Sequence, residues 1–175
     1  VELLSLWSRK SVSMLEMEAM LGEIISAFGA RAATLSLSFK YFLDKSAPAS
    51  GIVSPLDYEC TFEGSIADGE YRFVLVVTVP IITLCPCSKE ISDRGAHSQR
   101  ALLTVRLETD PGVIVWLEDL IPLLERQGSC GIYPLLKRVD EKWVTESSYD
   151  NPKFVEDVVR DAVIALRELP GARRF

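Results

Sequence analysis

Apolar residues at helical spacing mark three segments of the chain. Residues 12–28 place apolar side chains three and four positions apart, which predicts a helix that ends at Gly29. A second helix is expected near residues 113–127, closed by Gly128. The strongest pattern covers residues 152–168 and predicts a third helix.

The third helix has its own start signals. Asp150 or Asn151 is the expected N-cap, and Pro152 suits the first turn. The apolar stripe expected to face the core consists of Phe154, Val155, Val158, Val159, Ala162 and Leu166.

Between the first and second helices the hydrophobic period changes to two. Residues 33–43 alternate apolar and polar side chains, which predicts a strand with one buried face. Alternation returns at residues 56–63, and residues 71–79 are rich in β-branched and aromatic types. Asp68-Gly69 lies between these two runs and predicts the tight turn of a β-hairpin. Residues 101–108 predict one more strand.

The order of these elements favours the α+β class, because strands and helices are segregated along the chain and the strands are antiparallel. With 175 residues and a mass of 19.5 kDa, we expect a single domain over residues 1–175. The chain begins at Val1 without a leader and stops soon after a helical pattern, so we expect it to be incomplete at both ends.

Charge and composition exclude several classes of function. The net charge of −6 and the pI of about 4.9 disfavour nucleic acid as a partner, since phosphate binding needs a basic surface. No apolar run approaches the roughly 18 residues of a membrane span, so we expect a soluble, cytoplasmic protein. Four cysteines in a chain of this kind do not predict a disulfide framework.

The long polar connection over residues 83–100 concentrates the reactive side chains. It contains Cys85, Cys87 and His97, which is the single histidine of the chain. In extended backbone the two thiols of Cys85-Pro86-Cys87 would project to one side and suit a metal, whereas the alternative is a pair of small, partly buried residues at a strand end. Connections of this length are more often functional than short hairpin loops are.

A metal site needs a further ligand, and carboxylates are the candidates. Asp140-Glu141 stands in a charged segment that also fits a solvated charge cluster beside a loop. Glu156 stands among apolar residues of the last helix, either as a surface carboxylate or as one that accepts hydrogen bonds from a ligand. A thiolate, an imidazole and a carboxylate around one divalent ion would favour metal-assisted hydrolysis. The common hydrolase, kinase and dinucleotide motifs are missing from the sequence.

Three segments together resemble GTP cyclohydrolase type IB. They are LCPCSKEISDRGAHSQR, YPLLKRVDEKWVTE and NPKFVEDVVRD, and the resemblance covers about residues 56–170. It implies the tunnelling fold, in which an antiparallel sheet with helices on one face assembles into barrels. It also implies an enzyme that converts GTP to 7,8-dihydroneopterin triphosphate and formate, at the entry to folate and pterin biosynthesis. Val139 departs from the family pattern, where a proline is expected.

The resemblance also assigns roles to individual residues. Cys85 and His97 match the catalytic metal ligands, Glu141 matches the ligand glutamate, and Glu156 matches the glutamate that binds the guanine ring. One divalent ion per site is implied, with zinc, manganese and iron all compatible with these ligands. Cys87 belongs to the same motif but is not assigned to the metal.

Two further expectations concern partners. The basic candidates to hold the triphosphate are Lys89, Arg94, Arg100, Lys137 and Arg138. Sites of the tunnelling fold lie between subunits, so we expect a homo-oligomer, a tetramer by resemblance.

Two alternative functions stay open: an archaeal-type GTP cyclohydrolase with a cyclic phosphate product, and a non-catalytic purine or pterin binder. A queuosine-pathway reductase of the same fold is disfavoured, because its motif is not found.

Overall fold

The computed structural model describes residue 7 and residues 12–175. The elements follow the chain in this order: α2 (Met14–Phe28), β1 (Ala32–Ser46), β2 (Val53–Ala67), β3 (Glu70–Leu84), α3 (Pro86–Ile91), β4 (Ser98–Thr109), α4 (Leu117–Glu125), β5 (Cys130–Gly131), α5 (Arg138–Asp150), α6 (Val155–Arg167) and β6 (Ala172–Arg174). None of the helices in the described part of the chain has the length and hydrophobicity of a transmembrane span.

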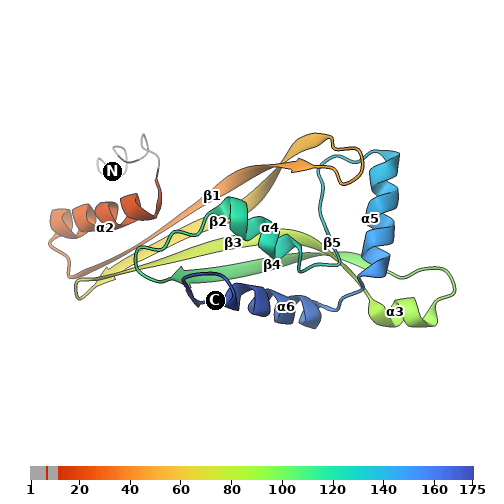
Figure 1. Cartoon of the computed structure of the whole chain (residues 1–175). Helices are drawn as coiled ribbons and strands as arrows, with labels where there is room; N and C mark the ends of the chain where they lie inside the picture. The colour runs from red at the N-terminus through yellow and green to blue at the C-terminus, as the bar shows by residue number, and fades with distance from the viewer. Residues whose placement is uncertain (1–6, 8–11) are drawn as a thin grey trace.

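The strands form one antiparallel sheet in the order β1-β2-β3-β4-β6, with β5 added to β3 (Figure 1). The predicted hairpin between β2 and β3 is confirmed, with Ala67 paired to Glu70. Asp68 and Gly69 have φ values of 52° and 81°, which is the left-handed pair that a tight hairpin turn requires. The predicted α+β class with antiparallel strands is therefore confirmed.

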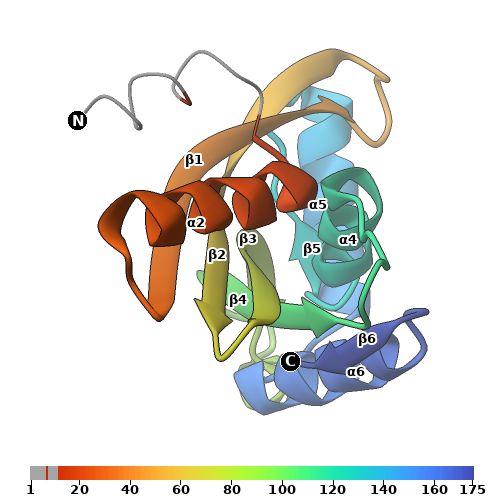
Figure 2. The same cartoon turned by 90° about the vertical axis from the view of Figure 1, so that its left-hand side faces the viewer.

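β3 pairs with different strands along its length. β2 pairs with its first half as far as Thr78 and then leaves it. Beyond that point the short strand β5 pairs with Ile81 and Ile82, while β4 follows the other edge to Leu84 (Figure 2). The C-terminal end of β3 is thus held on both sides, and it is the end that leads into Cys85.

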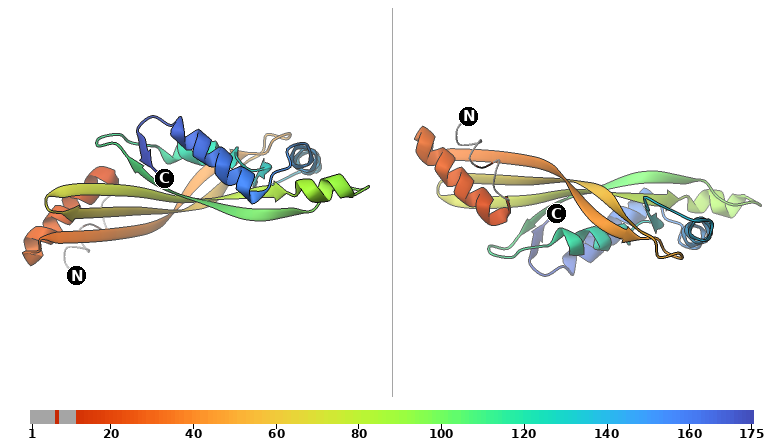
Figure 3. Two further views of the ribbon diagram at one scale, coloured as in Figure 1. Left: turned by 90° about the horizontal axis from the view of Figure 1, so that it is seen from below. Right: turned by 90° about the horizontal axis from the view of Figure 1, so that it is seen from above.

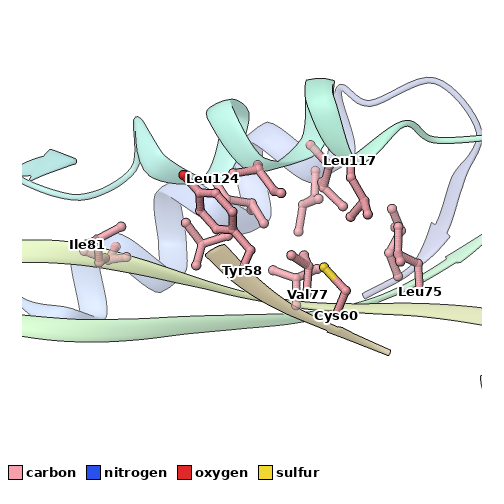
Figure 4. Close-up of a cluster of buried hydrophobic side chains, with 14 residues drawn as sticks. Tyr58, Cys60, Leu75, Val77, Ile81, Leu117 and Leu124 are labelled. Atoms are coloured by element: carbon pink, nitrogen blue, oxygen red, sulfur yellow. The ribbon is translucent and has the colours of Figure 1, made fainter. Parts of the chain in front are cut away.

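The core lies on the sheet face that α4 and α6 cover (Figure 3). Alternate residues of β2 and β3, such as Tyr58, Cys60 and Val77, pack against Leu120 and Leu124 of α4 (Figure 4). Each of these side chains is buried, so their packing supplies much of the hydrophobic stabilisation of the fold.

The other face of the sheet is polar over much of its area. The side chains of Ser38 and Thr61 are 2.9 Å apart across β1 and β2, and Arg106 donates to both carboxylate oxygens of Glu63 at 2.7 and 2.6 Å. Period-two alternation therefore predicts correctly which residues of the strands face the helices.

The predicted end of the first helix is confirmed, and the other helix boundaries shift. α2 ends at Gly29, as predicted, and the φ of Gly29 is left-handed at 58°. The helix begins after the N-cap Ser13, slightly later than the start expected at residue 12. The helix expected over 113–127 is shorter, because residues before the N-cap Trp116 are not helical.

The predicted start of the last helix is wrong. Its N-cap is Phe154, and the Asp157 carboxylate accepts a hydrogen bond from the Phe154 N–H at 3.0 Å. Because of this local bond, the helix begins at Val155 and not at Pro152. Of the expected apolar stripe, Val158, Ala162 and Leu166 are buried, and the remaining members stay exposed.

Close packing at Gly128 gives a stability prediction. A Cβ at this position would lie 2.9 Å from the Ile81 Cβ and 3.1 Å from the Ile82 carbonyl oxygen, which are parts of a central strand. We expect Gly128→Ala to destabilise the protein by about 1–3 kcal/mol through overpacking, measured by urea unfolding.

The control is Gly22→Ala in α2, where a Cβ meets nothing within 4 Å. This change should stabilise the protein by about 0.5–1 kcal/mol, since alanine favours helix. Equal unfolding midpoints for the two variants would contradict the packing at Gly128.

Candidate functional site

The ends of β3 and β4 bring Cys85 and His97 together. The last register pair of these strands is Leu84 with Ser98. One residue further, the Cys85 N–H donates to the His97 carbonyl oxygen at 3.1 Å. The two residues most strongly implicated by the sequence are therefore neighbours across a strand pair.

The thiol of Cys85 is half-buried and polarised. It accepts a hydrogen bond from the Ser88 backbone N–H at 3.5 Å, and this bond lowers the pKa of the Cys85 thiol below its ordinary value. A thiolate is the form that binds metals, so the environment of Cys85 suits a ligand.

Cys87 does not share that environment. The expectation that Cys85 and Cys87 project to one side of extended backbone is wrong, because Pro86 starts the short helix α3. Cys85 has extended φ and ψ angles of −68° and 117° as the N-cap, whereas Cys87 is helical and exposed. A helix of six residues is too short to show a hydrophobic period in the sequence.

The segment before α6 is tied to the same end of β3. The Lys153 N–H donates to the Leu84 carbonyl oxygen at 3.0 Å, and the Leu84 N–H donates to the Ser129 hydroxyl at 3.0 Å. Glu156 lies in the first turn of α6, three residues after Lys153, and is exposed. The fold thus starts α6, with Glu156, close to the strand end that precedes Cys85.

Asp140 and Glu141 are adjacent in sequence but differ completely in structure. Asp140 is 0% exposed, so its interpretation as part of a solvated charge cluster is wrong. Its carboxylate accepts hydrogen bonds from the N–H groups of Ala49, Ser50 and Lys137 and from the Ser50 hydroxyl, at 2.6–2.9 Å. Glu141 is exposed.

The contacts of Asp140 fix the start of α5 against the turn between β1 and β2. Burial acts to raise the pKa of its carboxyl, but the hydrogen bonds from Ser50, Lys137 and Ala49 outweigh burial and hold the pKa well below its ordinary value. Asp140 is a structural anchor that sequence reasoning missed.

Glu141 lies at the opposite end of α5 from the Cys85 region. The far end of α5 lies near α3 (Figure 1). There the Lys89 ammonium donates to the Tyr149 carbonyl oxygen and lies 4.0 Å from the centre of the Tyr149 ring. Glu141 and Tyr149 are eight positions apart, which is ~12 Å along a helix axis. Over residues 7 and 12–175, no three His, Cys, Asp or Glu side chains of the single chain converge as a metal site.

A partly buried ion pair positions the chain that leads into α5. Lys45 donates to the Glu125 carboxylate at 2.7 Å and to the Ile132 carbonyl oxygen at 2.6 Å. The Tyr58 hydroxyl donates to the same carboxylate at 2.7 Å, and burial, followed by this bond, raises the pKa of Tyr58. Lys45 continues the core-facing alternation of residues 33–43. This position in the pattern is the sequence feature from which an inward-facing Lys45 could have been predicted.

The basic residues proposed for the triphosphate divide into two groups. The Lys89 ammonium is engaged with Tyr149. The other four candidates are exposed: Arg94 and Arg100 flank His97, while Lys137 and Arg138 stand at the start of α5.

The donor set fits a divalent metal. The Cys85 thiol, whose pKa is lowered, is a sulfur donor, and His97 across the strand pair carries an imidazole nitrogen. Zinc and similar ions accept both donor types together with a carboxylate oxygen. Within one chain, Cys85 and His97 are the two residues of this donor set that a backbone hydrogen bond joins.

Comparison with known proteins places the chain in a family. A family model described as type I GTP cyclohydrolase folE2 (GCHY-1) matches residues 1–175. GTP cyclohydrolase FolE2 of Thiobacillus denitrificans is 46% identical over 170 residues, covering 97% of this chain and 62% of that protein. The FolE2 of Halorhodospira halophila is 52% identical over 152 residues, covering 87% and 58%.

A third relative, the FolE2 of Geobacter sulfurreducens, is 48% identical over 166 residues, covering 95% of this chain and 63% of that protein. The chain therefore spans about three fifths of the length of these relatives. The match of the family model over all 175 residues and the identity to several FolE2 proteins lead to one conclusion: the chain belongs to the type I GTP cyclohydrolase family of FolE2.

Proposed function

We propose that the protein is a GTP cyclohydrolase that converts GTP and water to 7,8-dihydroneopterin triphosphate and formate, the first step of folate and pterin biosynthesis. The observation that carries this proposal is the Cys85–His97 pair at the ends of β3 and β4, with its lowered thiol pKa. The relatives are named GTP cyclohydrolase FolE2, which supports the same activity here.

One divalent ion per site is the proposed cofactor, held by Cys85, His97 and Glu141. When bound, such an ion acidifies a water molecule to supply hydroxide near neutral pH, which is the nucleophile that opening the guanine ring at C8 requires. The hydrogen bond from the Ser88 N–H favours the thiolate form of Cys85. The backbone bond between Cys85 and His97 fixes the spacing of the two ligands.

Glu156 is the proposed guanine-binding residue. Its carboxylate is exposed in the first turn of α6, and the bond between Lys153 and Leu84 anchors that turn beside the strand end. A carboxylate can accept paired hydrogen bonds from the guanine N–H groups. Adenine would leave it unpaired, so this contact selects for guanine.

The proposed site is completed between subunits of a homotetramer built as tunnelling-fold barrels. This part of the proposal rests on the separation of Glu141 from Cys85 within one chain. Both carboxylate-bearing helices also expose apolar residues next to the carboxylates. Val139 and Trp143 flank Glu141 at 56% and 41% exposure, and Val155 and Val159 are each 56% exposed beside Glu156. Exposed apolar groups of this kind are typical of contact surfaces.

The test is the release of formate from GTP by purified, metal-loaded protein, with ATP as the control substrate. We expect stoichiometric formate and a product with the mass of 7,8-dihydroneopterin triphosphate from GTP, and neither from ATP. A cyclic phosphate product would indicate the archaeal-type reaction instead. Tight binding of GTP by the metal-loaded protein without formate would overturn the proposal in favour of a purine binder.

A further inference from the structure

Ser88 makes contacts with both residues of the Cys85–His97 pair. Its hydroxyl donates to the Cys85 carbonyl oxygen at 3.0 Å and accepts from the His97 N–H at 3.1 Å. Its own N–H donates to the Cys85 sulfur at 3.5 Å. Together with the bond from the Cys85 N–H to the His97 carbonyl oxygen, these contacts close a ring through the three residues.

The connection that contains Ser88 has little other support. None of the six residues of α3 is buried, so hydrophobic packing does not fix this helix. The contact of Lys89 with Tyr149 holds α3 against α5 but does not touch Cys85 or His97. The Ser88 hydroxyl is the side chain that joins α3 to the start of β4 at the His97 backbone.

The two hydroxyl bonds act on the ligand pair in different ways. The bond to the Cys85 carbonyl oxygen fixes the first turn of α3 and so keeps the Ser88 N–H directed at the sulfur. The bond from the His97 N–H ties the His97 backbone to α3. Loss of the hydroxyl would leave the pair joined by the single backbone bond between Cys85 and His97.

We propose that Ser88 is a positioning residue, whose hydroxyl sets the thiol of Cys85 and the imidazole of His97 in the mutual geometry that a metal ion requires. The inference rests on the proposed function, since it assumes that these two side chains share one ion. Groups that orient metal ligands through hydrogen bonds typically change metal affinity about 10–100-fold when they are removed.

The test measures cobalt binding to the full protein by the sulfur-to-cobalt charge-transfer absorption, which reports the thiolate bond independently of turnover. Ser88→Ala should weaken cobalt affinity about 10–100-fold, while Ser88→Thr, which keeps a hydroxyl, should restore it to within about threefold of the original. The matched control is Ser92→Ala. Ser92 lies in the same connection and accepts a hydrogen bond from the Arg94 N–H at 3.2 Å.

Melting of the metal-free variants separates positioning from folding. We expect the melting temperature of the metal-free Ser88→Ala protein to match that of Ser92→Ala. Suppose that the original protein binds cobalt and releases formate. Unchanged cobalt affinity in Ser88→Ala, or failure of Ser88→Thr to restore the affinity, would then overturn the inference and leave the proposed function standing. If the original protein shows no sulfur-to-cobalt band at all, the metal site of the proposed function fails, and the role of Ser88 fails with it.

Discussion

Replacing Cys85 with serine is expected to reduce formate release from GTP by on the order of 1,000-fold or more. Cys85 supplies the thiol of the proposed metal site, and a hydrogen bond from the Ser88 N–H lowers its pKa. A serine hydroxyl is a poor ligand for zinc and similar ions at neutral pH, so the variant should also lose bound metal. Metal content by elemental analysis and formate release under substrate saturation measure the two effects.

Cys87→Ser provides the matched control for this variant. Cys87 is a free, exposed cysteine only two residues away, on α3. Its replacement should change neither metal content nor activity by more than about twofold. If both variants lost metal equally, the two thiols would share the ion, leaving less room for water and favouring a closed, structural site.

Replacing Asp140 with alanine is expected to lower the melting temperature by about 10 °C. The change removes a fully buried carboxylate and leaves the N–H groups of Ala49, Ser50 and Lys137 without their acceptor. Buried donors without an acceptor are costly, and this set joins the turn after β1 to the start of α5. Differential scanning calorimetry measures the effect.

Two neighbouring variants sharpen this test. Glu141→Ala alters the next residue of the same helix, which is exposed, and should shift the melting temperature by about 2 °C or less. Asp140→Asn keeps one acceptor oxygen and should fall between the alanine variant and the original protein. A melting temperature for Asp140→Ala within the range of Glu141→Ala would contradict the anchoring role.

Asp140 also makes stability depend on pH. Its pKa is lower in the folded protein than in the unfolded chain, so its contribution is fully present above about pH 4 and is lost as the pH falls further through the folded pKa. Asp140→Asn cannot titrate and should therefore lose less stability between about pH 4 and pH 2 than the original protein does. Parallel slopes in urea unfolding over this range would contradict the assignment.

The strands were the most predictable part of the fold. Alternation over residues 33–43 identified the core-facing side of β1, because a half-buried strand exposes every second side chain to solvent. The turn at Asp68 and Gly69 fixed the register of β2 and β3 by local backbone preference alone. These features depend on residues close together in sequence.

The elements that were missed have weak local signals. α5 contains few apolar residues and is anchored by Asp140, whose partners Ala49 and Ser50 lie some 90 residues earlier in the chain. α3 has six residues and no buried side chain, so it shows no hydrophobic period. In α5, contacts with distant parts of the chain outweigh local propensity. The first turn of α3 is held by local bonds between Ser88 and Cys85.

In the candidate site, too, the sequence identified residues, and tertiary contacts decided how they are placed. The motif around Cys85 and His97 identified the two residues, and pairing of β3 with β4 brings them together across the connection between them. Charge and position alone did not distinguish Asp140 from Glu141, and only the family resemblance singled out Glu141, whereas folding buries Asp140 and exposes Glu141. Their roles as anchor and proposed ligand follow from that difference.

By itself, the sequence determined the α+β class, the alternating faces of the strands, the hairpin turn and the identity of the reactive residues, because each depends on side-chain chemistry or short-range periodicity. Only the tertiary structure decided which of those residues meet. Cys85 and His97 meet because the register of two strands carries them to the same edge of the sheet. Glu141 is held away from them by the length of α5 and by the buried bonds of Asp140, which depend on residues that the chain brings together only when it folds.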